Sequence, residues 1–180
     1  MTAPNDIIGV DVSDNGDKTH LKTLARSHAR KMGSLNESIT NGDGNYAGIL
    51  AEYVFVSLFE TAERVDQYNF DIKMQNTDGS DMTVDIKTLR RTVDVQPHYS
   101  GFVPDAGMNQ NCDFYYFCSY NEPEKRLQLC GYLPNELFYR KADHLEAGER
   151  LPGGFEVEAD CHRVKIEDLY QFDVVRDIDN

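Results

Sequence analysis

The stretch YNFDIKMQNTDGSDMTVDIKT, residues 68–88, decides the fold. Two runs rich in β-forming residues, 68–74 and 82–88, flank a turn-forming segment at 76–80 with Asp-Gly at its centre. In the second run apolar and polar residues alternate, which is typical of a strand with one face on a core. The stretch therefore predicts an antiparallel β-hairpin.

An apolar segment precedes this hairpin. YAGILAEYVFVSLF, residues 46–59, is apolar nearly all the way round, which predicts a buried helix running on to Arg64. Glu52 is the only charge in the apolar run. A buried carboxylate is costly unless it is paired, protonated or bound to a metal. Gly48, one helical turn earlier, leaves space beside this carboxylate.

The order of these acids resembles that of the PD-(D/E)xK nuclease superfamily. There, a helix glutamate precedes a strand aspartate, and a hairpin leads to acid-x-Lys on the neighbouring strand. The matching positions here are Glu52, Asp71, Asp85 and Lys87, with Phe70 where the motif has proline. The resemblance implies an α/β fold with a mixed central β-sheet flanked by helices, the restriction-endonuclease-like fold.

The same resemblance implies a Mg²⁺-dependent deoxyribonuclease without an organic cofactor. Asp71 and Asp85 would be the main metal ligands, with the Ile86 carbonyl beside them and Glu52 as a further ligand, direct or through water. Mn²⁺ would substitute for Mg²⁺, since both accept oxygen ligands. Lys87 would orient the attacking water or stabilise the phosphate charge.

Other assignments of these acids stay open. Asp-x-Lys also occurs at Asp71-Ile72-Lys73, but no strand acid is evident upstream of it. Asp78 and Asp81 are rivals to Asp71, although both fall in or beside the turn. The hairpin acids and Lys87 would alternatively form an ion-pair cluster on an exposed sheet face, which leaves Glu52 unexplained.

The charge of the chain is strongly uneven. It has 18 Lys+Arg against 31 Asp+Glu, a net charge of −13, which argues against non-specific binding to nucleic acid or anionic membrane. Residues 18–36 nevertheless carry five bases and no acid. Within them, 18–33 predicts an amphipathic helix that stops at Gly33. Four of its bases are spaced four apart and would contact phosphates along one edge, or form an ordinary solvated face: Lys18, Lys22, Arg26 and Arg30.

Residues 90–111 show no period and predict a long functional loop. The candidates for phosphate contact in it are Arg90, Arg91 and His98, each with exposed surface as its alternative. Tyr99 and Phe102 are candidates for stacking on bases.

The rest of the chain predicts a few further elements. Strands are expected at 112–120 and 126–133, followed by a short helix at 134–141. Weaker strands are expected at 155–157 and 163–166.

Length and composition suit one domain over residues 1–180, with 1–17 as a flexible acidic N-terminus. The chain has neither a long apolar run nor a signal peptide, which predicts a cytoplasmic protein without membrane contact. The four cysteines are expected to be free buried thiols. A zinc site through Cys161-His162 and distant partners is the alternative.

The predicted partner is DNA, and a homodimer is expected because many members of the superfamily act as dimers. An Asp-rich, Lys-poor composition suits a halophile, and the small free-standing members include phage enzymes. One alternative function is a catalytically silent member of the fold that binds DNA or regulates a protein. An acidic mimic of DNA is another, but it leaves the basic helix unexplained.

Overall fold

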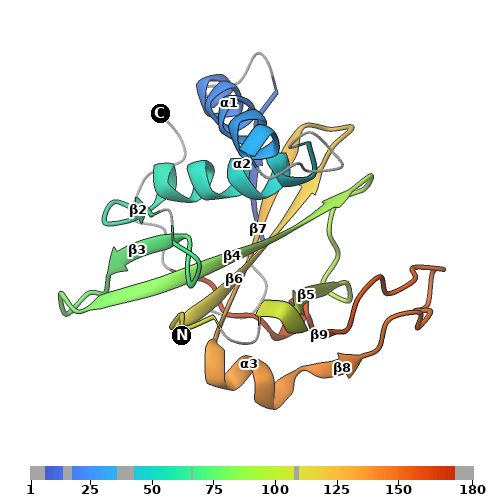
Figure 1. Cartoon of the computed structure of the whole chain (residues 1–180). Coiled ribbons are helices and arrows are strands. Elements are labelled where there is room, and N and C mark those ends of the chain that lie inside the picture. The colour runs from blue at the N-terminus through green and yellow to red at the C-terminus, as the bar shows by residue number, and fades with distance from the viewer. Residues whose placement is uncertain (1–6, 14–17, 36–42, 66, 108–109, 173–180) are drawn as a thin grey trace.

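Two β-sheets of unequal size organise the molecule (Figure 1). The computed structural model describes residues 7–13, 18–35, 43–65, 67–107 and 110–172. Six strands form a large mixed sheet and three form a small antiparallel one. The chain is thus a mixed α/β protein, as its sequence predicts.

The large sheet has the strand order β1-β7-β6-β4-β3-β2. Its strands are β1 (Ile8–Asp11), β2 (Glu63–Arg64), β3 (Ile72–Gln75), β4 (Asp81–Arg91), β6 (Phe114–Asn121) and β7 (Arg126–Pro134). The central pair β4–β6 is parallel, and every other neighbouring pair is antiparallel. The predicted hairpin is confirmed: β3 and β4 pair antiparallel around a turn in which Gly79 has a φ of 82°, a conformation that suits glycine.

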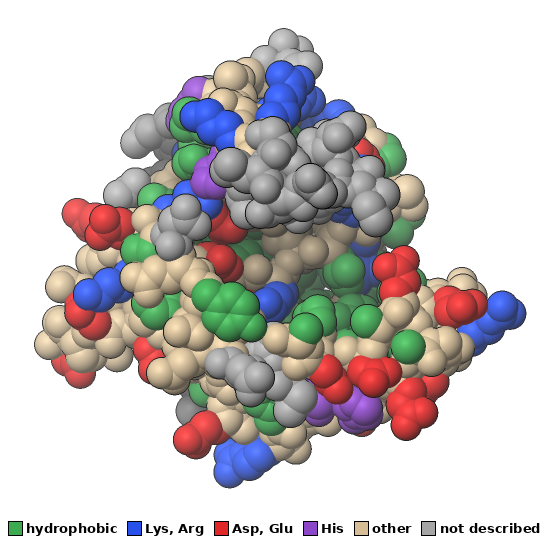
Figure 2. Space-filling view, in the orientation of Figure 1, with side chains coloured by type: hydrophobic (Ala, Val, Ile, Leu, Met, Phe, Trp, Pro, Cys, Tyr) green, Lys and Arg blue, Asp and Glu red, His purple; other side chains and the backbone are tan. Residues whose placement is uncertain are grey.

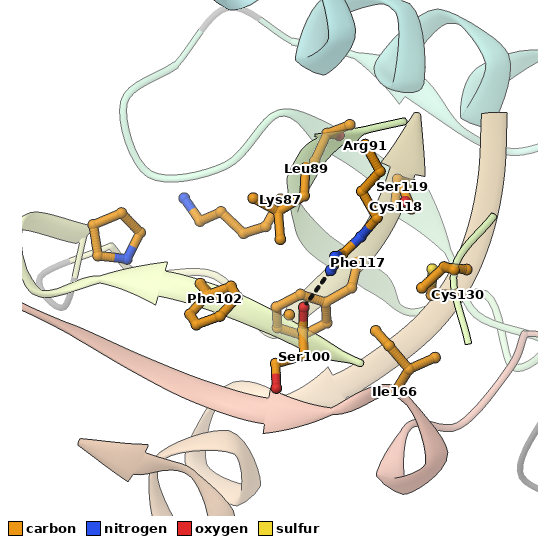
Figure 3. Close-up of a pocket in the computed structure, with 14 residues that line it drawn as sticks. Lys87, Leu89, Arg91, Ser100, Phe102, Phe117, Cys118, Ser119, Cys130 and Ile166 are labelled. Carbon is orange, nitrogen blue, oxygen red and sulfur yellow. Dashed lines mark hydrogen bonds between the residues drawn. The ribbon is translucent and has the colours of Figure 1, made fainter. Parts of the chain in front are cut away.

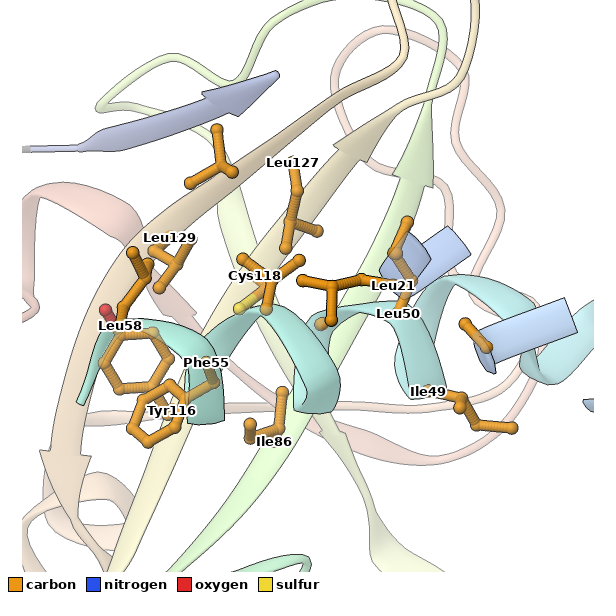
Figure 4. Packing of buried hydrophobic residues seen from close by; sticks show 14 of the residues in the cluster. Leu21, Ile49, Leu50, Phe55, Leu58, Ile86, Tyr116, Cys118, Leu127 and Leu129 are labelled. Atoms are coloured by element: carbon orange, nitrogen blue, oxygen red, sulfur yellow. The ribbon is translucent and has the colours of Figure 1, made fainter. Parts of the chain in front are cut away.

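Helices α1 (Thr19–Leu35) and α2 (Asp43–Leu58) lie on one side of the large sheet, with α2 nearest to it (Figure 1). Because α2 is apolar nearly all round, it is buried between α1 and the sheet. Its Leu50 and Phe55 are fully buried and share a core with Ile86, Tyr116 and Leu129 of three strands (Figure 4). Burying a side chain of this size stabilises the fold by roughly 2 to 3 kcal/mol.

The small sheet covers the other side, in the order β5-β9-β8. The elements on this side are β5 (Ser100–Pro104), η1 (Asp105–Gly107), α3 (Asn135–Lys141), β8 (Asp143–Leu145), β9 (Cys161–Lys165) and η2 (Ile166–Asp168). Val103, Phe117, Phe138 and Val164 are buried together between the sheets. The contact is close at Gly101, where an added Cβ would collide with the ring of Phe117.

Several predicted boundaries are wrong. Helix α1 continues past Gly33 to Leu35. Helix α2 ends at Leu58 rather than Arg64, since the apolar run stops there and Glu63–Arg64 pair with β3 instead. At the other end of the sheet, part of the segment expected to be flexible forms β1, which pairs with β7.

The predicted loop at 90–111 is also wrong. Its first residues extend β4 to Arg91, and its middle forms β5 and η1, which belong to the small sheet. Five-residue strands with proline and glycine, such as β5, have little periodicity of their own and are stabilised by their neighbours. Near the C-terminus a strand is confirmed, β9 at Cys161–Lys165. The strand expected at 155–157 forms only one isolated bridge. Strand β8 was not predicted.

Two expectations about the whole chain can be compared with the described residues. The four cysteines are free and buried, as predicted. Among the described helices, none combines the length and the apolar character needed to cross a bilayer.

Candidate metal centre

Asp71 lies immediately before β3 rather than within a strand, because the pairing with β4 starts at Ile72. Its backbone is held from two sides: its N–H donates to the carbonyl of Val84 at 3.0 Å, and its carbonyl accepts from the N–H of Val65 at 2.8 Å. Its carboxylate Oδ2 accepts a hydrogen bond from the backbone N–H of Ile86 at 2.7 Å. The hairpin therefore fixes this carboxylate against β4.

Asp85 and Lys87 stand two residues apart on β4 and project from the same face. Asp85 is 2% exposed, so the alternative of an ion-pair cluster on an exposed face is wrong for this residue. The Lys87 Nζ lies 2.7 Å from Asp85 Oδ2. This oxygen is buried, and the ammonium is the cation beside it. One buried carboxylate oxygen at the site is thus paired with a cation.

Gln110 joins this pair and was missed by the sequence reasoning. Its side-chain amide donates to Asp85 Oδ1 at 3.0 Å and to the carbonyl of Tyr68 at 3.1 Å, while its oxygen accepts from Lys87 Nζ at 3.0 Å. A lone glutamine in an aperiodic segment carries no local signal. Only the fold of the segment before β6 brings it here.

Glu52 approaches from α2, with 13% of its side chain exposed. It accepts a hydrogen bond from Arg64 Nε at 2.5 Å, and the Arg64 guanidinium lies over the ring of Tyr53 at 5.3 Å. The expected need for a partner is therefore met by an arginine. The space expected at Gly48 is present, since an added Cβ would meet nothing within 4 Å.

The environment of Asp71 disfavours its charged form. Burial, together with the negative charges of Asp85 and Glu52, raises the pKa of Asp71 from 3.8 to about 7. Burial also raises the pKa of Asp85, and Lys87 offsets part of that effect. Asp71 is therefore within electrostatic range of both other acids, although the ligand atoms of the three do not all lie within 4.8 Å of one another. The rival acids Asp78 and Asp81 are exposed and bonded to Ser80 and Lys73 respectively, so they do not join the cluster.

Figure 2 shows one face of the molecule with a hollow near its middle. Basic and acidic side chains lie at the rim of this hollow. A cavity of about 210 Å³ is lined by the C-terminal half of β4, by residues of β6 and β7, and by β5 of the small sheet (Figure 3). Lys87 and Arg91 both line this cavity but extend in different directions. Lys87 is the base on β4 that lies next to Asp85, whereas Arg91 reaches the small sheet at Ser100.

The predicted phosphate contacts on β4 and after it are not brought together. Arg90 makes a two-pronged ion pair with Glu122, at 2.7 and 2.8 Å. Arg91 is half-buried and donates to the carbonyl of Ser100 at 2.9 Å, with its guanidinium 4.9 Å from the ring centre of Tyr99. Arg90 and His98 are exposed, so a surface role stays open for both.

The candidates for base stacking are also engaged within the protein. Tyr99 lies under Arg91 and is half-buried. Phe102 stacks on Phe155 with ring centres 5.7 Å apart. Of this pair, Phe155 is the exposed ring.

The basic edge of α1 is shorter than predicted. Lys22 is 3% exposed, because it lies on the side of the helix that carries the buried Ala25. The pKa of Asp11 is lowered mainly by hydrogen bonds from Ser13, with smaller contributions from the charges of Arg126 and Lys22. Lys22 is therefore wrong as a phosphate contact. Arg26 and Arg30 are exposed, as predicted, and Lys18 is half-buried.

The sequence matches no protein-family model and no curated protein. The resemblance to the PD-(D/E)xK superfamily therefore stays a prediction that rests on the residues of this chain.

Proposed function

We propose that the chain is a Mg²⁺-dependent nuclease that hydrolyses phosphodiester bonds in DNA, with a restriction-endonuclease-like fold. The observation that carries this proposal is the convergence of Asp71, Asp85 and Lys87 on one hairpin, opposite Glu52 on a buried helix. The parallel pairing of β4 with β6, after an antiparallel hairpin, gives the mixed central sheet that the superfamily resemblance implies.

The donor set suits a hard divalent cation. Mg²⁺ prefers oxygen ligands and binds through one or two carboxylates while keeping several waters. Asp71, Asp85 and the Ile86 carbonyl would hold it, and the ion would share the buried Asp85 oxygen with the Lys87 ammonium. Glu52 would act through water as long as it keeps its hydrogen bond from Arg64. When bound, the ion would acidify a water and neutralise charge on the phosphate.

The residues around the acids have separate roles in this proposal. The Lys87 ammonium is held by Asp85 and Gln110, so it would orient the attacking water or stabilise the developing phosphate charge. Lys87 would act electrostatically rather than as a general base, because its side chain is already engaged with the Asp85 carboxylate and Gln110. Gln110 would be a positioning residue that fixes Asp85 and Lys87 relative to each other.

A nicking assay tests this proposal. Supercoiled plasmid and short duplexes are incubated with the full chain in Mg²⁺, in Mn²⁺ and in EDTA. Cleavage should require the metal, and Asp85→Asn should slow it about a hundredfold or more. Asp81→Asn is a matched control, because Asp81 stands on the same strand but is exposed and paired with Lys73. Cleavage that persists in EDTA or in Asp85→Asn would refute the proposed mechanism.

A catalytically silent DNA-binding member of the same fold is the second candidate. It is favoured by the cation contacts that Glu52 and Asp85 already make, with Arg64 and Lys87. The same plasmid distinguishes the two functions, since a silent member would shift its mobility in a gel without cutting it in either metal.

A further inference from the structure

A second group of metal-ligating side chains lies on the small sheet, apart from the acids of the hairpin. Asp105 of η1 contacts two histidines, one with each carboxylate oxygen. His144 Nε2 of β8 lies 2.9 Å from Oδ2, and His162 Nδ1 of β9 lies 3.0 Å from Oδ1. The ligand atoms of the three residues all lie within 4.8 Å of one another.

The backbone of the small sheet fixes this arrangement. His144 and His162 are directly opposite each other in the antiparallel β8–β9 pair, so their side chains share a face. The pairing of β5 with β9 ends at Pro104 and Cys161, and the next residue, Asp105, donates its N–H to the carbonyl of Asp160 at 3.0 Å. Three elements far apart in sequence therefore present their side chains to one point.

We propose that Asp105, His144 and His162 bind a Zn²⁺ ion that clamps η1 to the β8–β9 pair. Two imidazole nitrogens and one carboxylate oxygen form a ligand set that Zn²⁺ takes with water at the fourth position. Zinc–ligand bonds of about 2.1 Å place tetrahedral ligands about 3.4 Å apart. The three ligand atoms, which already lie within 4.8 Å of one another, would have to settle at about this spacing, with both histidines turned toward one of the two carboxylate oxygens that they contact here.

The surroundings of the three residues favour a cation. The carboxylates of Asp160 and Glu146 lie near His144 and add negative charge around it. The ring of Tyr139 packs edge-on against His162, with ring centres 5.2 Å apart, and orients that ligand. His144 is 43% exposed at its side chain, which gives an ion access from solvent. In Figure 2, histidine side chains lie among acidic ones below and to the right of the hollow.

The sequence also offers a zinc site through Cys161 and His162. Of these two residues, only His162 belongs to the proposed site. The thiol of Cys161 is buried with Leu145 and Val157 in a small apolar cluster. Successive residues of a strand point to opposite faces, so Cys161 faces away from its neighbour His162. The partner of His162 in the proposed site is the cross-strand histidine instead.

Calorimetric titration tests the zinc site. The full chain, stripped with EDTA and dialysed into chelator-free buffer, is titrated with ZnCl₂. One Zn²⁺ per chain should bind with a micromolar or lower Kd, and His144→Ala should weaken binding at least about tenfold. His144→Ala removes a half-exposed side chain and is expected to fold; far-ultraviolet circular dichroism verifies this.

Two control variants place the ion. His98→Ala removes an exposed histidine elsewhere and should leave the Kd unchanged. Asp85→Asn disables the hairpin acids and should also leave it unchanged, so this test is independent of the proposed nuclease function. Co²⁺ in place of Zn²⁺ should give the strong visible absorption of a tetrahedral site, and His144→Ala should lose it. Failure of the wild type to bind Zn²⁺ below 100 μM, or equal affinity in wild type and His144→Ala, would overturn the proposal, leaving a hydrogen-bonded His–Asp–His cluster.

Discussion

Replacing Asp71 with asparagine should change how the stability of the metal-free protein depends on pH. The folded state raises the pKa of this carboxyl from 3.8 to about 7. Between these values the folded protein holds a proton that the unfolded chain has released. The free energy of unfolding therefore falls as the pH rises through this window, since the unfolded state binds fewer protons there.

The size of the effect follows from the two pKa values. For a single group with these constants, the loss of stability between pH 5 and pH 8 is about 2 to 3 kcal/mol. Asparagine cannot titrate, and its side-chain oxygen can still accept the hydrogen bond from Ile86. The wild type should thus lose about 2 to 3 kcal/mol relative to Asp71→Asn over this range.

Urea unfolding in EDTA at pH 5 and pH 8 measures this difference. Asp81→Asn serves as the control, because its carboxyl is exposed and its pKa is lowered, so it is ionised throughout the range in both states. Mg²⁺ added at pH 8 should stabilise the wild type and Asp81→Asn but not Asp71→Asn. If the difference between wild type and Asp71→Asn is the same at both pH values, the raised pKa of Asp71, with burial and the neighbouring acids as its causes, is refuted.

Three further predictions concern residues around the site and in the fold. Gln110→Leu should lower the nicking rate about 10- to 100-fold while the dependence on Mg²⁺ persists, because the amide only positions other groups; unchanged kinetics would remove it from the site. Replacing both Arg26 and Arg30 with alanine should weaken DNA binding and flatten its salt dependence in a fluorescence-anisotropy titration, and an unaltered salt slope would make them ordinary surface. Gly101→Ala should destabilise the protein by about 1 to 3 kcal/mol in urea, since the two sheets touch there, whereas Gly48→Ala in open space should stabilise α2 by up to about 1 kcal/mol.

The sequence predicted those residues of the candidate site whose positions depend only on their neighbours in the chain. A two-residue period places Asp85 and Lys87 on one face of a strand wherever that strand lies, and Asp-Gly between two β-forming runs specifies the hairpin that carries Asp71. Glu52 was identifiable because a lone acid in an apolar helix needs a partner. The identity of that partner was not identifiable, because Arg64 reaches Glu52 only after the helix has ended and the chain has turned back.

Burial and long-range pairing decided the other assignments. The four-residue spacing of bases on α1 is a sequence property, but Lys22 became buried on the side of the helix that carries Ala25. Arg91 carries the same charge as the exposed bases, yet the small sheet covers it.

The sequence by itself determined the hairpin, the buried helix and the order of the acids, because each depends on residues a few positions apart. The tertiary structure alone decided that Gln110 joins Asp85 and that His144 meets His162, since each of these contacts joins segments with no local period. Their positions follow from which strands pair, and strand pairing is settled by the burial of the whole core rather than by any one segment.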